Sequence, residues 1–166
     1  PFVKPNNKAL RNVNRVVDFT DPVLQQAIDD TIDTLHHMQN TTGRGVGLAA
    51  SQIGEPFGFY VVSIPEERAK KEKAVGGICE PVDTMVYVNA TVTPLPDTTT
   101  SVYEEGCFSV PGIKSTAVHR AQSVEVKAFD RYGKPILAFI AEGFLARVHQ
   151  HEFDHTQGKE YLYHAS

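Results

Sequence analysis

The sequence predicts an α+β fold, in which antiparallel or mixed strands pack around a helix near the C-terminal end of the chain. Three observations indicate this fold: an amphipathic helix early in the chain, several separate apolar runs of strand length, and a second helix with an apolar stripe. Strands flanked by two such helices are typical of an α+β domain. Because the 166 residues contain no internal repeat and no linker, we expect one domain that covers residues 1–166.

The first predicted helix begins at Pro22 and ends before Gly43. Asp21 belongs to the residue types that cap helix N-termini, and proline is favoured in the first turn. Apolar residues then recur at helical spacing in one stripe, which consists of Leu24, Ile28, Ile32, Leu35 and Met38. We expect Gly43 to stop the helix, since glycine commonly follows a helix C-terminus. The stripe indicates core packing and implies no cofactor.

Four apolar segments in the middle of the chain have the length and composition of strands. They are residues 57–63, 85–92, 123–129 and 135–141. The last two are separated by the turn sequence DRYG at residues 130–133. Between the first two, an insertion from about residue 65 to residue 84 contains the charged run EERAKKEK, which we expect to be solvated.

The last predicted helix carries the sequence HEFDH at residues 151–155, which is an HExxH motif. Helical residues four apart are nearly eclipsed and about 6 Å apart along the axis, so both imidazoles can bind one metal ion. The glutamate beside the first histidine can then reach the water that the metal polarises. Phe144, Val148, His151 and His155 share one stripe, so the motif lies on the apolar face of a core helix. A chance occurrence of the motif on a polar helix is the alternative interpretation.

The third ligand of such a metal is not found downstream. The metzincin pattern places a third histidine where this chain has Tyr161, and Glu160 is too close to His155 to be the glutamate of a later helix. The third ligand must therefore lie upstream. The chain has two cysteines, Cys79 and Cys107, whose different settings favour a reducing compartment over a disulfide.

Three segments together resemble the peptide deformylase family. Residues 45–52 (GVGLAASQ) are similar to its first motif, GxGxAAxQ, and residues 105–109 (EGCFS) to its second, EGCLS. Residues 150–158 (QHEFDHTQG) resemble its third motif, QHExDHLxG. Phe108 and Thr156 each replace a leucine of the family pattern, and the three motifs follow in the family's order.

The resemblance implies a metal-dependent hydrolase that removes the N-formyl group from formylmethionine at the N-terminus of nascent polypeptides and releases formate. It implies that Cys107, His151 and His155 bind the metal and leave a fourth position open for water. It implies Fe²⁺ in the cell, with Zn²⁺, Ni²⁺ or Co²⁺ able to substitute, although the ligand types alone favour zinc. A plain buried cysteine is the alternative interpretation of Cys107.

The resemblance also implies roles for residues around the metal. Glu152 would take a proton from water and pass it to the departing amine. The side-chain amide of Gln52 and the backbone N–H of Phe108 would donate to the developing oxyanion. The predicted substrate-binding residues are Gly45 and Gly47, in a turn that the substrate backbone approaches, and Val46, Phe144 and Val148, around the methionine side chain. A structural role in a turn is the alternative for the glycines and for Gln52.

Two other functions are weighed against this one. An HExxH zinc peptidase is disfavoured by the absence of a downstream third ligand. An inactive binding protein with a structural zinc would need four protein ligands, and the sequence offers no fourth candidate beside the three. The remaining histidines are expected to be surface or structural residues; they are His36, His37, His119, His149 and His164.

Composition limits the partners. A formal charge of −4 without a basic stripe argues against direct binding of nucleic acid, and no apolar run is long enough to span a membrane. We expect a monomer that acts on formylmethionyl peptides in a bacterial cytoplasm, an organelle matrix or stroma, or a host-cell cytoplasm if the source is viral. Only eight residues follow Gly158, whereas many family members continue into a C-terminal helix that contacts the ribosome, so association with the ribosome is left open.

Overall fold

The structure is a computed structural model that describes residues 13–74, 79–96, 100–105 and 116–159. In chain order its elements are α1 (Pro22–Thr42), β1 (Gly47–Ala49), the 3₁₀ helix η2 (Ala50–Ile53), β2 (Phe59–Ile64), α2 (Glu66–Ala74), β3 (Val82–Pro94), β4 (Thr100–Glu105), β5 (Thr116–Ala121), β6 (Ser123–Phe129), β7 (Phe139–Glu142) and α3 (Gly143–Thr156). Five strands form an antiparallel sheet in the order β1-β2-β3-β6-β7, and β4 pairs with β5 in a separate sheet. The predicted α+β fold is confirmed.

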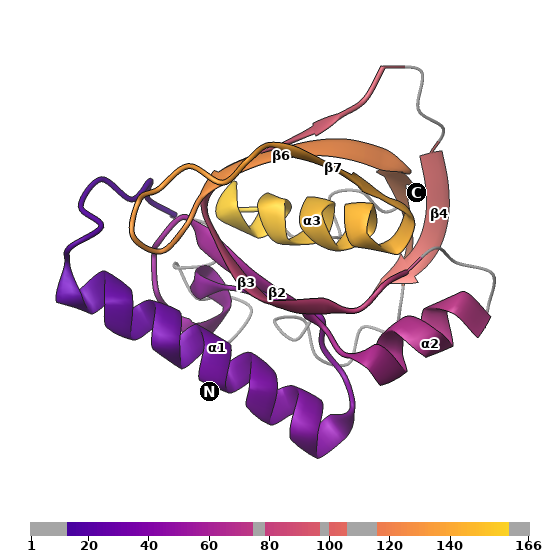
Figure 1. Ribbon diagram of the computed structural model, residues 1–166, viewed down its shortest axis with the longest axis horizontal. Coiled ribbons are helices and arrows are strands. Elements are labelled where there is room, and N and C mark those ends of the chain that lie inside the picture. Colours follow the sequence, from indigo (N-terminus) through magenta and orange to yellow (C-terminus); the bar gives the residue numbers. More distant parts are fainter. Residues whose placement is uncertain (1–12, 75–78, 97–99, 106–115, 160–166) are drawn as a thin grey trace.

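The five-stranded sheet curves around α3, and α1 lies outside that curve (Figure 1). β2 separates the two helices, and all six of its residues are buried. Phe59 and Val61 belong to the hydrophobic cluster that contains α1, whereas Tyr60, Val62 and Ile64 belong to the cluster that contains α3. Successive strand residues point to opposite faces, so one strand contributes to both clusters. The HExxH helix therefore lies inside the fold.

Both ends of α1 are those predicted from the sequence. The Asp21 carboxylate accepts a hydrogen bond from the Val23 N–H (2.9 Å), and Gly43 ends the helix with a left-handed φ of +67°. Of the predicted stripe, Leu24, Ile28 and Leu35 are buried, and Ile32 and Met38 are half-buried. The stripe is thus the core-facing side of α1.

Three of the four strand predictions are confirmed. Residues 57–63, 85–92 and 123–129 correspond to β2, β3 and β6. The fourth, residues 135–141, is wrong over its first half, because β7 begins at Phe139. Pro135 makes an isolated bridge with Phe129, and since proline lacks the N–H that a ladder needs, the strand is not continuous from there.

The charged run after β2 is a helix, which the sequence prediction did not assign. Most of α2 is exposed, as expected for a solvated run, but Ala69 is buried in the cluster that contains α3. The Arg68 guanidinium pairs with the Glu72 carboxylate one turn later at 2.9 Å. Pairs with this i,i+4 spacing support a helix, so the charges that indicated solvation also stabilise regular structure.

Four further elements, β1, η2, β4 and β5, carry no prediction of strand or helix. β1 has three residues and η2 has four, which is too short for a periodic pattern to be recognised. β1 and the first three residues of η2 lie within the first sequence motif, so the motif that indicated chemistry also forms an edge strand and most of a tight helical turn.

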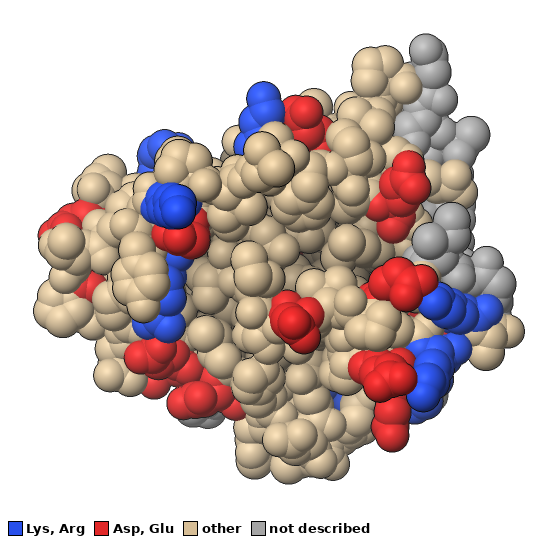
Figure 2. All heavy atoms as spheres, in the orientation of Figure 1, with Lys and Arg blue, Asp and Glu red and all other residues tan. Residues whose placement is uncertain are grey.

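The face of the molecule in Figure 2 carries charged side chains of both signs. On the face in Figure 2, the acidic and basic side chains of the described residues are interspersed and no large continuous basic patch is visible. Among the described residues, every helix is too short or too polar to cross a membrane.

Candidate active site and metal centre

α3 brings the two motif histidines together, as their spacing predicts. The Nε2 atoms of His151 and His155 lie 3.3 Å apart, and their ring centroids lie 5.0 Å apart. Two nitrogens bound at about 2.0–2.1 Å to one tetrahedral ion would be separated by about 3.3–3.4 Å. The two imidazoles therefore have the separation that two ligands of one metal ion require.

The rest of the predicted ligand set is not described by the structure. Cys107, the third predicted ligand, lies outside the described residues, as does Phe108, the predicted oxyanion donor. Among the described residues, no group of three His, Cys, Asp or Glu side chains could hold a metal ion. In the sequence, Cys107 comes two positions after Glu105, the last residue of β4. The described donors are thus two imidazoles, whose chemistry suits zinc, iron, nickel and copper ions.

Glu152 is buried against the backbone of β1. A Cβ atom added to Gly47 would lie 2.8 Å from Cγ of Glu152 and 3.0 Å from its Oε1 atom. The same Oε1 atom is 3.9 Å from Nε2 of His151. Since any larger residue at position 47 would collide with Glu152, the glycine provides the space in which this side chain lies.

The two glycines of the first motif have different structural settings. Gly45 has a φ of +97°, which favours glycine and agrees with the predicted turn. Gly47 does not lie in that turn, because it pairs with Val62 in the β1–β2 ladder. The need for glycine at position 47 comes from Glu152, a contact between distant parts of the chain.

Gln52 is buried in η2 with a defined orientation of its amide. Its Oε1 atom accepts a hydrogen bond from the Ala49 N–H at 2.9 Å. A backbone N–H can pair only with the oxygen of the amide, so this contact decides which end is oxygen and which is nitrogen. The other end of the side chain is the Nε2 donor, which is the atom that an oxyanion would need.

Comparison with known proteins identifies the family. The family model described as polypeptide deformylase matches residues 1–166. The chain belongs to this family. The peptide deformylase of Chromobacterium violaceum is 38% identical over 152 residues (92% of this chain, 78% of the relative). That of Stutzerimonas stutzeri is 36% identical over 153 residues (92% of this chain, 79% of the relative).

Solved deformylase structures have the same fold. The crystal structure of a peptide deformylase from Legionella pneumophila has a TM-score of 0.76 and 36% identity, and covers 100% of this chain and 85% of its own. A Met-Ala-Ser-bound class I type b peptide deformylase from Acinetobacter baumannii has a TM-score of 0.80 and 27% identity, with 99% and 96% covered. Deformylases are metal-dependent hydrolases that remove the N-formyl group from the N-terminal methionine of nascent polypeptides, and this activity is the function of the chain.

The residues predicted to surround the methionine side chain lie in one hydrophobic cluster. Val148 is buried, and Val46 and Phe144 pack half-buried against the same cluster. The Arg68 guanidinium of α2 lies 5.1 Å from the centroid of the Phe144 ring, within the range of a cation–π contact. The charged helix that the sequence left unassigned therefore contacts Phe144, one of the residues predicted to surround the methionine side chain.

His149 of α3 was predicted from the sequence to be a surface or structural residue. His149 is fully buried, with Nδ1 2.6 Å from the Tyr60 hydroxyl. The rings of Tyr87 and Phe139 lie at 4.8 Å and 5.5 Å from the imidazole centroid, both in edge-on orientations. Burial lowers the pKa of His149 to about 4, so the ring is neutral at pH 7. His149 is thus a structural residue.

Two further residues of the third motif make contacts that the sequence prediction missed. Gln150 forms hydrogen bonds with the backbone of Ala121, and the Asp154 carboxylate forms a buried ion pair with Arg120. The sequence marked Gln150 and Asp154 only as members of the third motif. Their partners on β5 lie in no motif, so nothing in the sequence indicated the pairs.

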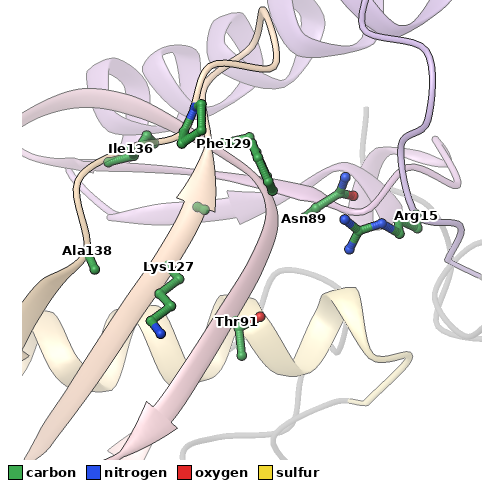
Figure 3. A pocket seen from close by; sticks show the side chains of 9 residues that line it. Arg15, Asn89, Thr91, Lys127, Phe129, Ile136 and Ala138 are labelled. Carbon is green, nitrogen blue, oxygen red and sulfur yellow. The ribbon is translucent and has the colours of Figure 1, made fainter.

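A separate pocket of about 330 Å³ lies between the N-terminal segment, β3, β6 and the loop before β7 (Figure 3). Its lining includes Arg15, Asn89, Thr91, Lys127, Phe129 and Ile136. None of the predicted site residues lines it. This pocket is therefore distinct from the candidate active site.

Proposed function

We propose that the chain deformylates formylmethionyl peptides with a metal bound by Cys107, His151 and His155. The observation that carries the proposal is the 3.3 Å separation of the two Nε2 atoms, beside a glutamate buried against Gly47. We propose Fe²⁺ as the ion in the cell, with Zn²⁺, Ni²⁺ or Co²⁺ able to replace it. When bound, the ion would polarise the formyl carbonyl and lower the pKa of a water molecule.

Glu152 is the proposed proton carrier. Its carboxylate accepts a proton from the attacking water and donates it to the amine that leaves as the amide bond breaks. The support for this role is position: the carboxylate is buried, and its Oε1 atom lies 3.9 Å from a proposed ligand nitrogen. Gly47 allows this position because it has no side chain.

Gln52 and Phe108 are the proposed donors to the oxyanion. As the formyl carbon becomes tetrahedral, its oxygen gains negative charge, which the Gln52 Nε2 group and the Phe108 backbone N–H would stabilise. The Ala49 N–H holds the other end of the Gln52 amide, so the donor needs little reorganisation when charge develops.

Val46, Phe144 and Val148 are the proposed wall of the methionine pocket, and Gly45 and Gly47 the proposed backbone contact of the substrate. An apolar wall suits an unbranched thioether side chain, which is flexible and polarisable. The Acinetobacter baumannii relative is described with Met-Ala-Ser bound, a peptide that begins with methionine. A formyl-Met peptide is therefore the proposed substrate.

We propose that one chain suffices for activity, because His151, His155, Glu152, Gln52 and Gly47 all come from the same chain. The bacterial origin of the relatives supports action in a bacterial cytoplasm, where nascent chains begin with formylmethionine. An organelle matrix or stroma, or the host cytoplasm for a viral source, would provide the same substrate.

The test is formate release from a formyl-Met-Ala peptide, with metal analysis of the same sample. We expect Cys107→Ala to lose both stoichiometric metal and activity. The matched control is Cys79→Ala, which removes the other cysteine, a buried residue near α2, and should keep both. Stoichiometric metal in the Cys107 variant would reject the proposed ligand set.

A further inference from the structure

A second stripe of α3, next to the histidine stripe, holds the helix against β5. Gln150 and Asp154 are four residues apart, and each directly precedes a motif histidine. The Gln150 amide accepts the Ala121 N–H at 2.9 Å and donates to the Ala121 carbonyl at 2.7 Å. One residue earlier on β5, the Arg120 guanidinium donates a hydrogen bond to the Asp154 carboxylate. Two adjacent residues of β5 thus contact two successive turns of α3.

These contacts join parts of the fold that do not share a sheet. β5 pairs with β4, and this hairpin is separate from the five-stranded sheet. β4 ends at Glu105 and β5 begins at Thr116, so the hairpin bounds the segment that contains Cys107. In the sequence, the proposed third ligand Cys107 thus comes only two positions after the end of β4.

We propose that Arg120, Gln150 and Asp154 are positioning residues for the metal centre. They fix the β4–β5 hairpin against α3, and thereby set the coordination geometry and the affinity for the metal. The inference rests on the proposed role of Cys107 as the third ligand.

The physical character of the ion pair favours a positioning role over a stabilising one. The Arg120 and Asp154 side chains are 3% and 12% exposed. The free energy lost when both charged groups leave water is about as large as the free energy gained from their attraction. An apolar pair of similar size often stabilises a protein equally well. A charged hydrogen bond is directional, however, so the pair can hold two elements in one orientation.

Co²⁺ is the probe for this inference, because a thiolate ligand gives it a charge-transfer absorption band and its visible bands report the coordination geometry. The main variant is the double substitution Arg120→Met/Asp154→Leu, which removes both charges of the ion pair together. We expect its Co²⁺ affinity, measured by competition with a chelator, to fall roughly 10- to 100-fold, as when partners of metal ligands are removed. We expect the thiolate band to weaken as well.

Two further variants separate positioning from stability. Arg131→Met/Asp29→Leu removes the ion pair between the β6–β7 loop and α1, which joins elements other than α3 and β5. It should keep the Co²⁺ affinity and the thiolate band. Asp154→Asn retains an acceptor for Arg120, and should restore much of the affinity and the band lost in the double variant.

The outcomes are distinct. An unchanged band and affinity in Arg120→Met/Asp154→Leu, with only a lower Tm, would overturn the inference and leave the pair a structural role. An equal loss of affinity in the Arg131/Asp29 control would overturn it too, because the effect would not be specific to α3. If the unmodified protein lacks a thiolate band, Cys107 is not a ligand, and the proposed ligand set fails together with this inference.

Discussion

His149 and His155 lie on the same helix, and both are fully buried, yet their surroundings differ. His149 is hydrogen-bonded to the Tyr60 hydroxyl and enclosed by aromatic rings. His155 instead directs its Nε2 atom toward Nε2 of His151 at 3.3 Å. Burial alone therefore does not distinguish a structural histidine from a candidate ligand, and the atom that each ring nitrogen faces does.

The helix geometry explains the difference. Residues two apart on a helix are about 200° apart around the axis, so His149 and His151 point to nearly opposite sides of α3. The side with His149 is closed by apolar rings, where an uncharged imidazole is favoured. On the other side, two nitrogens share one small space, an arrangement that a bound cation would stabilise.

The largest expected effect comes from removing one member of the histidine pair. His151→Ala and His155→Ala should each lose bound metal, and formate release should fall to background, because two remaining ligands bind an ion weakly. His149→Gln is the matched control and should keep stoichiometric metal and most of kcat. Elemental analysis and a formyl-Met-Ala assay on the same samples would check this, and metal loss in the His149 variant would break the comparison.

Glu152→Ala should have the next largest effect, on chemistry alone. The proposed role in proton transfer predicts a decrease in kcat of roughly 10²- to 10⁴-fold. Metal content should not change, since the proposed ligands are intact. A variant with near-normal kcat would show that another group moves the proton.

Gly47→Ala should have a smaller effect that acts through Glu152. The added Cβ would lie 2.8 Å from Cγ of Glu152, so the flexible glutamate moves and the fold is retained. A displacement of about 1 Å predicts a decrease in kcat of roughly 10²-fold. The control is Gly43→Ala, where a Cβ meets open space but a φ of +67° is strained, so Tm should fall while kcat stays normal.

A double variant makes the Gly47 prediction sharper. If position 47 acts only through the glutamate, Gly47→Ala should cause little further loss of kcat in the Glu152→Ala background. Fully additive losses in the double variant would instead mean that the strand itself, and not the carboxylate, is disturbed.

The smallest expected effect is on stability, and it concerns His149 alone. An unfolded histidine takes up a proton near pH 6.5, whereas folded His149 does so only near pH 4. The unfolded state therefore binds more protons between these values, and the free energy of unfolding falls as the pH decreases from 6.5 to 4. The total decrease in the free energy of unfolding over this range is about 3 kcal/mol. Above pH 6.5, His149 is neutral in both states and causes no loss of stability.

Urea unfolding of the metal-free protein at pH 7 and at pH 4.5 would measure this contribution. His149→Gln should reduce the difference in unfolding free energy between the two pH values, and His37→Gln, on the exposed side of α1, is the control for loss of a histidine. An unaltered difference in the His149 variant would assign the acid sensitivity to other groups.

The sequence was sufficient to predict features that are formed within a single helix. The ends of α1 follow from Asp21 and Gly43, and the convergence of His151 and His155 follows from helical spacing alone. The family motifs then supplied the activity, which the comparisons confirm.

Contacts between elements that are distant in the chain could not be predicted from the sequence. The contact of Gly47 with Glu152 requires β1 to lie beside α3, and the Arg120–Asp154 pair requires β5 to lie along the same helix. No local pattern encodes either contact, because each joins segments that lie far apart in the chain. The assignment of α2 failed for another reason, since its charged composition fits both a solvated loop and an exposed helix.

The position of β2 between α1 and α3 also affects how the chain can fold. Most of the buried residues in the cluster with α1 lie between Val16 and Val61, so much of this half of the core can assemble from nearby parts of the chain. The cluster with α3 needs the helix that follows every strand in chain order. During synthesis, which proceeds from the N-terminus, the concave side of the sheet thus stays uncovered until α3 has left the ribosome. Completion of the hydrophobic core and assembly of the His151–His155 pair are then one late event, so a chain without α3 exposes apolar surface as well as lacking the site.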